Sequence, residues 1–326
     1  MRRRLILALP LTLAWPLHGR AQGAALRRRI GFLTASSAAA QAPLLAAFRE
    51  GMRQRRYAHG VDFTMESRFA DGDFSRLASL ARELIALQPE VLLVNSTPAN
   101  LAAKAATRDI PIVFVGVADP LGVKLVANLA RPDANITGIT NVVAELAGKR
   151  LEILREILPD ARRIAVLVNL KDQNSSLQIA NAQAAARRLN VALDPVLDVG
   201  TLDALAPAIR AARKARAAGA MRMVDPTATM FRRQTVELAN RERLPMMYAF
   251  REDVEAGGLA SYGTSLPHQY AQAASFVDRI LRGAKPAELP VEQPTKFEFA
   301  LNQRTGRLLG IEFPRELALR ADTIVE

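Results

Sequence analysis

The 326-residue sequence contains no cysteine and only three histidines. Without cysteine the chain has no disulfide, no thiolate metal ligand and no thiol nucleophile, and it lacks the residue that is lipidated in a bacterial lipoprotein. The absence of disulfides does not threaten folding, because a chain of this length can bury enough apolar surface to be stable without them.

The motifs of several catalytic and nucleotide-binding sites are also missing. There is no GxGxxG or GxxxxGK[ST] phosphate loop and no GxSxG nucleophile elbow. Beyond the first 21 residues the only histidines are His59 and His268. The chain therefore lacks the residues that a catalytic triad or a histidine-based metal site requires. Glu252, Asp253 and Glu255 are interpreted as helix-surface charge, although paired carboxylates alone can do acid–base work. We therefore expect no metal and no cofactor. An enzyme remains an alternative, but no catalytic motif in the sequence supports it.

The first residues have the three parts of a secretory signal. Met1–Arg4 is basic, Leu5–Leu17 is apolar but too short for a permanent membrane anchor, and Gly19-Arg20-Ala21 supplies the small residues that a signal peptidase reads. Cleavage is expected after Ala21, with Gly23 as the alternative. We therefore expect a soluble, exported protein in a bacterial periplasm that is not a lipoprotein.

The chain is basic, with a formal net charge of +12. A strongly basic domain raises the question of nucleic-acid binding. However, the arginines are spread over many predicted helices, and only 5% of the residues are aromatic. The densest basic run, Arg210–Arg222, is interpreted as the solvated face of an alanine-rich helix, with attraction to an anionic membrane surface as the alternative. We expect no nucleic-acid partner.

Short apolar runs that end in small polar residues recur along the chain. They are typical of the strands of a parallel sheet buried on both faces. In such sheets ligands bind beyond the carboxyl ends of the strands. The runs are Ile30–Ser37, Val91–Ala99, Ile112–Pro120, Ile164–Ser176 and Met246–Gly263.

The predicted strands alternate with helices, and this pattern occurs twice. Alternation of this kind predicts a parallel, doubly wound sheet. The expected strands are 28–34, 63–69, 91–95, 112–117, 136–141, 164–169, 192–197, 219–224, 246–250, 259–262 and 296–301. The expected helices are 43–55, 73–88 with Asp73 as N-cap, 99–107, 121–130, 146–158, 175–189, 202–217, 229–241, 269–281 and 303–309.

The sequence therefore predicts an α/β protein with two doubly wound parallel-sheet lobes joined by a multi-crossing hinge. Several elements follow the second sheet, so the chain is expected to return to the first lobe and then close on the second. The expected boundaries are residues 1–21 for the signal, 28–139 plus about 264–290 for lobe I, and 140–263 plus about 291–326 for lobe II.

Local motifs resemble a known family over essentially all of Arg28–Glu326. The matching stretches are Phe48–Met52, Ser96–Ala99, Val117–Pro120, Leu129–Pro132, Gly148–Leu151, Phe250–Glu252, Gly257–Leu259, Ser261–Gly263 and Val291–Phe297. Through them the sequence resembles the periplasmic substrate-binding proteins of ABC importers, in the family that includes tryptophan- and tyrosine-binding proteins.

The resemblance implies a type I periplasmic-binding-protein fold that closes over one ligand, acts as a monomer, and has an ABC permease with its ATPase as partners. It also implies that a ligand carboxylate meets hydroxyls and N–H groups at helix starts and that a ligand ammonium meets an Asp. By matching position, the implied ligand-binding residues are Ser36, Ser37, Asn95, Ser96, Thr97, Asp119, Asn169, Asn174, Ser175, Ser176, Asp225, Tyr248, Ser261 and Tyr262.

Some of these residues have a structural alternative. Asn174 or Ser175 caps a predicted helix whose N–H groups could also receive an anion. Asp225 precedes Pro226 and could pair with a ligand ammonium or form a turn. Tyr248 and Tyr262 could pack on an apolar or aromatic ligand or lie in the core.

Two stretches depart from the aromatic amino-acid binders of the family. Asp225 is followed by Pro226 and Thr227, whereas those binders carry Asp followed by Asn and Thr. The loop Lys171–Asn174 also carries charges that could change specificity. The sequence predicts a binder of a small amino-acid-like ligand that serves an importer, with a binder feeding a membrane sensor and an exported enzyme as alternatives.

Overall fold

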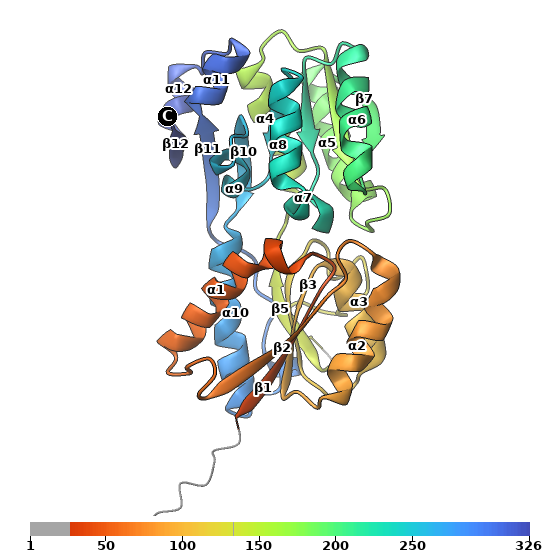
Figure 1. Cartoon of the computed structure of the whole chain (residues 1–326), viewed down its shortest axis with the longest axis vertical. Helices are drawn as coiled ribbons and strands as arrows, with labels where there is room; N and C mark the ends of the chain where they lie inside the picture. The colour runs from red at the N-terminus through yellow and green to blue at the C-terminus, as the bar shows by residue number, and fades with distance from the viewer. Residues whose placement is uncertain (1–26, 133) are drawn as a thin grey trace, which may run out of the picture.

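The chain forms two α/β lobes stacked along the long axis of the molecule (Figure 1). This computed structural model describes residues 27–132 and 134–326. The predicted signal segment, residues 1–21, lies outside the described residues. Within the described ranges, no helix is both long and apolar enough to cross a membrane.

Lobe I is built on a five-stranded sheet in which every neighbouring pair is parallel. The apolar runs of the sequence form its central strands, and they are buried because helices cover both faces. In spatial order the strands are β2 (Phe63–Phe69), β1 (Arg28–Thr34), β3 (Val91–Asn95), β4 (Ile112–Val117) and β5 (Ile136–Thr140). The strand order reverses between β1 and β3, which is where such sheets place a ligand.

The helices of lobe I include one that the chain supplies late. They are α1 (Ala38–Gln54), η1 (Phe74–Arg76), α2 (Leu77–Ala86), α3 (Thr97–Ala106), α10 (Leu266–Leu281) and η2 (Pro286–Glu288). Helix α10 lies against α1 (Figure 1), where Phe48, Tyr270 and Phe276 are fully buried in one apolar cluster. A side chain at Gly51 would collide with the backbone of Ala271, so glycine permits this close approach.

Lobe II is built on a seven-stranded sheet that is parallel except where β10 meets β11. In spatial order the strands are β12 (Thr323–Val325), β11 (Phe297–Asn302), β10 (Ala260–Thr264), β9 (Met246–Tyr248), β8 (Gly219–Arg222), β6 (Arg163–Val168) and β7 (Ala192–Asp198). Its helices are α4 (Leu146–Ile157), α5 (Ser175–Leu189), α6 (Leu202–Lys214), α7 (Pro226–Met230), α8 (Arg232–Arg241), α9 (Arg251–Glu255), α11 (Gln303–Leu309) and α12 (Arg315–Leu319).

Three segments connect the lobes, and they run side by side. The chain leaves lobe I after β5, returns between β10 and α10, and crosses again before β11. Thr140 donates its N–H to the carbonyl of Glu292 at 3.0 Å, and Ser265 donates to Lys296 at 3.4 Å. These backbone bonds tie each crossing to a neighbour, as expected of a hinge that allows the lobes to close on one another.

The structure corrects several predicted elements. Residues 121–130, predicted as a helix, form turns, because the Asp119 carboxylate accepts the N–H of Gly122 and Asn128 closes a second turn through Ala130. The single helix predicted over 229–241 is divided at Phe231 into α7 and α8. The helix predicted from 43 begins at Ala38, with Ser37 as its N-cap. Helix α12 and strand β12 were not expected.

Candidate functional site

A cavity of about 60 Å³ lies between the two lobes, at the carboxyl ends of both sheets. Lobe I contributes Gln41, Leu44, Asn95, Ser96, Thr97, Gly116, Asn141, Val143 and Leu266 to its wall. Lobe II contributes Asp172, Asn174, Val224, Asp225, Pro226, Thr229 and Phe250. The side chains therefore converge from strands and helix starts that are far apart in the sequence.

The lobes are closed around this cavity. The Asn174 side chain, at the start of α5, donates a hydrogen bond to the Thr97 hydroxyl at the start of α3, with 2.9 Å between the atoms. Both residues are buried. This bond crosses from one lobe to the other, so it exists only when the cavity is enclosed.

Lobe I presents amide groups that are held in place before any ligand arrives. The Asn95 Oδ1 accepts hydrogen bonds from Thr34 (3.0 Å) and Gln41 (3.3 Å), and Gln41 in turn accepts the Tyr270 hydroxyl at 2.5 Å. The Asn95 Nδ2 donates to the carbonyl of Val115 at 3.2 Å. This network ties α1, α10 and three strands to one rigid wall of the cavity.

The N-terminus of α3 opens into the cavity beside a strained serine. Ser96 has φ +80°, a conformation that costs an L-residue of order 1–3 kcal/mol, and such strain gathers at functional sites. Its side chain is buried, and its Oγ has no hydrogen-bond partner among the described residues. The first N–H groups of a helix carry partial positive charge. Together the free hydroxyl and the helix start can receive an anionic group.

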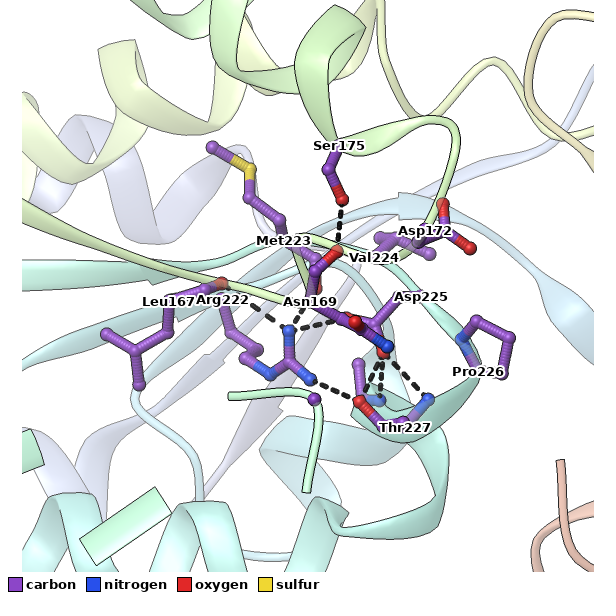
Figure 2. Close-up of polar contacts among 12 residues, drawn as sticks. Leu167, Asn169, Asp172, Ser175, Arg222, Met223, Val224, Asp225, Pro226 and Thr227 are labelled. Carbon is purple, nitrogen blue, oxygen red and sulfur yellow. Dashed lines mark hydrogen bonds and ion pairs between the residues drawn. The ribbon is translucent and has the colours of Figure 1, made fainter. Parts of the chain in front are cut away.

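In lobe II, Asp225 and Arg222 form a buried ion pair at 2.6 Å (Figure 2). The same carboxylate accepts the N–H groups of Thr227 (2.7 Å) and Ala228 (3.1 Å) and also the Thr227 hydroxyl. Asp225 is therefore the N-cap of α7, and its charge is neutralised from within the protein.

Asp172 is the second carboxylate in the wall, and it is 4% exposed. Its Oδ1 accepts the backbone N–H of Asn174 at 2.9 Å. Figure 2 shows its carboxylate turned away from the Arg222–Asp225 pair. No ion pair within the described ranges includes Asp172. Burial, with a smaller contribution from the Asp225 charge, raises the pKa of Asp172 from its ordinary 3.8 to about 7.

This shift predicts that closing the empty protein takes up a proton. A carboxyl whose pKa is higher in the closed form favours closure below its ordinary pKa, and that contribution is lost as the pH rises through about 7. We expect small-angle X-ray scattering of the ligand-free protein to give a larger radius of gyration at pH 8 than at pH 5. Asp172→Asn should be compact at both pH values, and an equal pH response in this variant would contradict the assignment.

Five of the residues implied by the sequence line the cavity: Asn95, Ser96, Thr97, Asn174 and Asp225. Sequence reasoning missed Gln41, Asn141 and Phe250. Gln41 lies inside α1, before the predicted helix start, whereas Asn141 and Phe250 are the last residues of the predicted strands 136–141 and 246–250, and that position was the available signal. Asp172 was noticed only as a charge in its loop. Its position between the end of a predicted strand and the start of a predicted helix could have identified it as a candidate site residue.

The other implied residues of lobe I lie outside the cavity wall. Ser36 is buried behind it, with its Oγ unpartnered among the described residues. Ser37 caps α1 and faces a second groove between the lobes. Asp119 holds the turn at Gly122.

The remaining implied residues of lobe II also serve other contacts. Ser175 donates to the carbonyl of Asn169 at 2.5 Å, and Asn169 in turn holds its own loop by accepting the N–H of Lys171. Ser176 is exposed. Further residues are packed in the lobe: Tyr248 is 3% exposed, Ser261 is fully buried, and Tyr262 packs on Phe297 and Phe299.

The chain is similar to known proteins over most of its length. The family model described as ABC transporter substrate binding protein matches residues 36–325. A tyrosine-binding protein of Clostridioides difficile (strain R20291) is 23% identical over 268 residues, which cover 81% of this chain and 76% of that protein. A conserved domain protein from Vibrio cholerae has 25% identity and a TM-score of 0.84, covering 91% of this chain and 99% of that one.

Two further solved structures are similar to the chain over most of its length. An ABC domain from Streptococcus pneumoniae in complex with L-Trp has a TM-score of 0.81, with 22% identity over 91% of this chain and all of that one. A ligand-free, open substrate-binding protein from C. difficile reaches only 0.66 at the same identity, over 92% of this chain and 99% of that one. Both structures share the fold of this chain.

Proposed function

The chain belongs to the family of ABC transporter substrate-binding proteins, and on that premise we propose that it captures a small amino-acid-like molecule between its lobes for an importer. In this role it works in the periplasm as a monomer, and its partners are a permease in the inner membrane and the associated ATPase. The predicted secretory signal supports this location.

One observation carries the choice of ligand class: the closed cavity has both an anion-binding end and a negatively charged end. The start of α3 with the free Ser96 hydroxyl suits a carboxylate, whereas Asp172 suits an ammonium group. Apolar side chains line much of the rest of the wall, namely Leu44, Val143, Val224, Phe250 and Leu266. This combination of a few polar groups in an apolar cavity is typical of small-molecule sites.

Two relatives support an amino acid as the ligand. One is named a tyrosine-binding protein, and one similar structure holds L-Trp. The cavity as it stands has room for roughly four to six water-sized groups, at about 10–15 Å³ each. A ligand with a large side chain would therefore hold the lobes further apart than they are here.

The proposal is tested on protein purified without refolding, by thermal unfolding with each of the twenty protein amino acids, from glycine to tryptophan. A ligand at 100 times its Kd should raise Tm by at least about 5 °C. Sugars and buffer without any added compound serve as controls. A stabilising amino acid that native mass spectrometry recovers unchanged supports a binder, whereas stabilisation by sugars alone would overturn the ligand class.

Native mass spectrometry also distinguishes a binding protein from an enzyme. A bound amino acid that is converted during incubation would replace the proposal by an exported enzyme. Trp15, in the predicted signal, is the only tryptophan of the chain. Fluorescence of a bound indole ligand would therefore be seen against a protein without tryptophan background after cleavage of the signal.

A further inference from the structure

We propose that Asp172, and not Asp225, is the counter-ion for the ligand's amino group, and that the ligand is an α-amino acid. This inference rests on the proposed function and deepens it. It differs from the sequence-based expectation, in which the family resemblance placed the ammonium partner at Asp225.

Asp225 already has a full set of partners. Arg222 neutralises its charge at 2.6 Å, and two backbone N–H groups and the Thr227 hydroxyl occupy its remaining acceptor positions. A ligand ammonium would have to displace Arg222 from a pair whose side chains are 3% and 0% exposed. Removing a partner from a buried ion pair is costly, so Asp225 is a poor site for a second cation.

The charged groups around the cavity leave one negative charge without a compensating positive charge. Among the described residues of its wall, lobe I contributes no charged side chain, and lobe II contributes Asp172 and Asp225. Arg222 lies behind Asp225 and offsets one of the two negative charges. The Asp172 carboxylate is left with hydrogen bonding from Asn174 and has no ion-pair partner among the described residues. A buried, unpaired carboxylate is strongly disfavoured unless a cation joins it.

The position of Asp172 next to the anion-binding end selects the ligand geometry. Asn174 links the two: its backbone N–H binds Asp172 at 2.9 Å, and its side chain binds Thr97 at the start of α3, also at 2.9 Å. The two ends of the site are therefore adjacent and not at opposite ends of the cavity. An α-amino acid carries its ammonium and carboxylate on the same carbon, so it can reach both ends at once.

The test measures how strongly the protein prefers an amino acid to the same molecule with a hydroxyl in place of the amino group. The probe pairs are L-alanine with L-lactate, L-leucine with its 2-hydroxy acid, and L-tryptophan with indole-3-lactate. Isothermal titration at pH 8 should show a preference of at least about 100-fold in the wild type for at least one pair. Asp172→Asn should reduce that preference to less than about fivefold.

Two variants make the result specific. The double variant Arg222→Met/Asp225→Asn removes both charges of the ion pair, so the net charge around the cavity is unchanged and the preference should be kept even if stability falls. Asp203→Asn removes an exposed carboxylate from the first turn of α6 and should change neither affinity nor preference. Thermal unfolding of each variant without ligand shows whether it is folded.

The outcomes separate this inference from the proposed function. If the wild type prefers an amino acid and Asp172→Asn keeps that preference, the assignment of Asp172 is wrong while the function stands. If the preference disappears in Arg222→Met/Asp225→Asn and persists in Asp172→Asn, the sequence-based expectation was right. If the wild type binds none of the amino acids, both the function and the inference are overturned.

Discussion

Replacing Arg222 with methionine should lower the free energy of unfolding by about 3–5 kcal/mol, which is the cost of leaving one partner of a buried ion pair alone. Methionine keeps much of the volume but removes the guanidinium that binds Asp225 at 2.6 Å and Thr227 at 3.1 Å. The remaining carboxylate is fully buried, so water cannot compensate for the loss. Urea unfolding followed by circular dichroism measures the effect.

The double variant Arg222→Met/Asp225→Asn provides the decisive comparison. With both charges gone, stability should recover by more than half of the loss, because no charge is left uncompensated. Arg213→Met serves as the matched control, since Arg213 is exposed on α6 and its replacement should stay within about 0.5 kcal/mol of wild type. A double variant as unstable as Arg222→Met would show that packing, and not charge, dominates at this site.

Gly138→Ala should destabilise the protein by about 4 kcal/mol or more, or prevent its accumulation as a folded protein. Gly138 lies in β5, where its added Cβ would be 2.1 Å from the carbonyl oxygen of Phe114 in β4. Its φ is +153°, which few L-residues adopt. The colliding atoms belong to the backbone of the neighbouring strand, so no change of rotamer can relieve the contact.

Gly60→Ala separates the two causes. Gly60 also has a positive φ, +82°, but nothing lies within 4 Å of an added Cβ. It should therefore cost only the conformational strain, about 1–2 kcal/mol. Chemical denaturation of both variants in parallel gives the difference, and losses of equal size would rule out the collision as the main effect.

The sequence predicted the strands better than the ends of the helices. Apolar runs such as Val91–Asn95 have one physical meaning in an alternating α/β pattern, because they are too short for a helix and too apolar for a surface. Helix starts were predicted less well. Helix α1 begins at Ala38, five residues before the predicted start, because the small alanines there carry no amphipathic signal. The lobe boundaries in the sequence analysis remain predictions.

The candidate site was predicted where it depends on topology and missed where it depends on tertiary packing. Ser96 and Thr97 follow a buried strand, and position alone places them at the carboxyl edge of the sheet. Tyr262 is the last residue of the predicted strand 259–262, but it lies inside β10 and its ring packs on Phe297 and Phe299. Nothing local in the sequence distinguishes these two cases, because side-chain direction there is set by β11, which is distant in the chain.

The role of Asp225 shows a further limit. An Asp-Pro pair after a strand is compatible both with a ligand contact and with a helix cap. Only the structure reveals that Arg222, three residues earlier on β8, turns back to pair with it. The unbalanced charge of Asp172 likewise follows from a count of all groups around the cavity, which a linear sequence does not provide.

If the protein serves an importer, as proposed, the lone buried carboxylate of Asp172 would have a consequence for energy use. An empty protein that closes at neutral pH must remove this charge from water without a partner, so few empty molecules will be closed. A transporter that responds to the closed form would then rarely hydrolyse ATP without cargo. In an acidic medium the proton that Asp172 takes up would weaken this safeguard, and ATP hydrolysis without cargo would become more frequent.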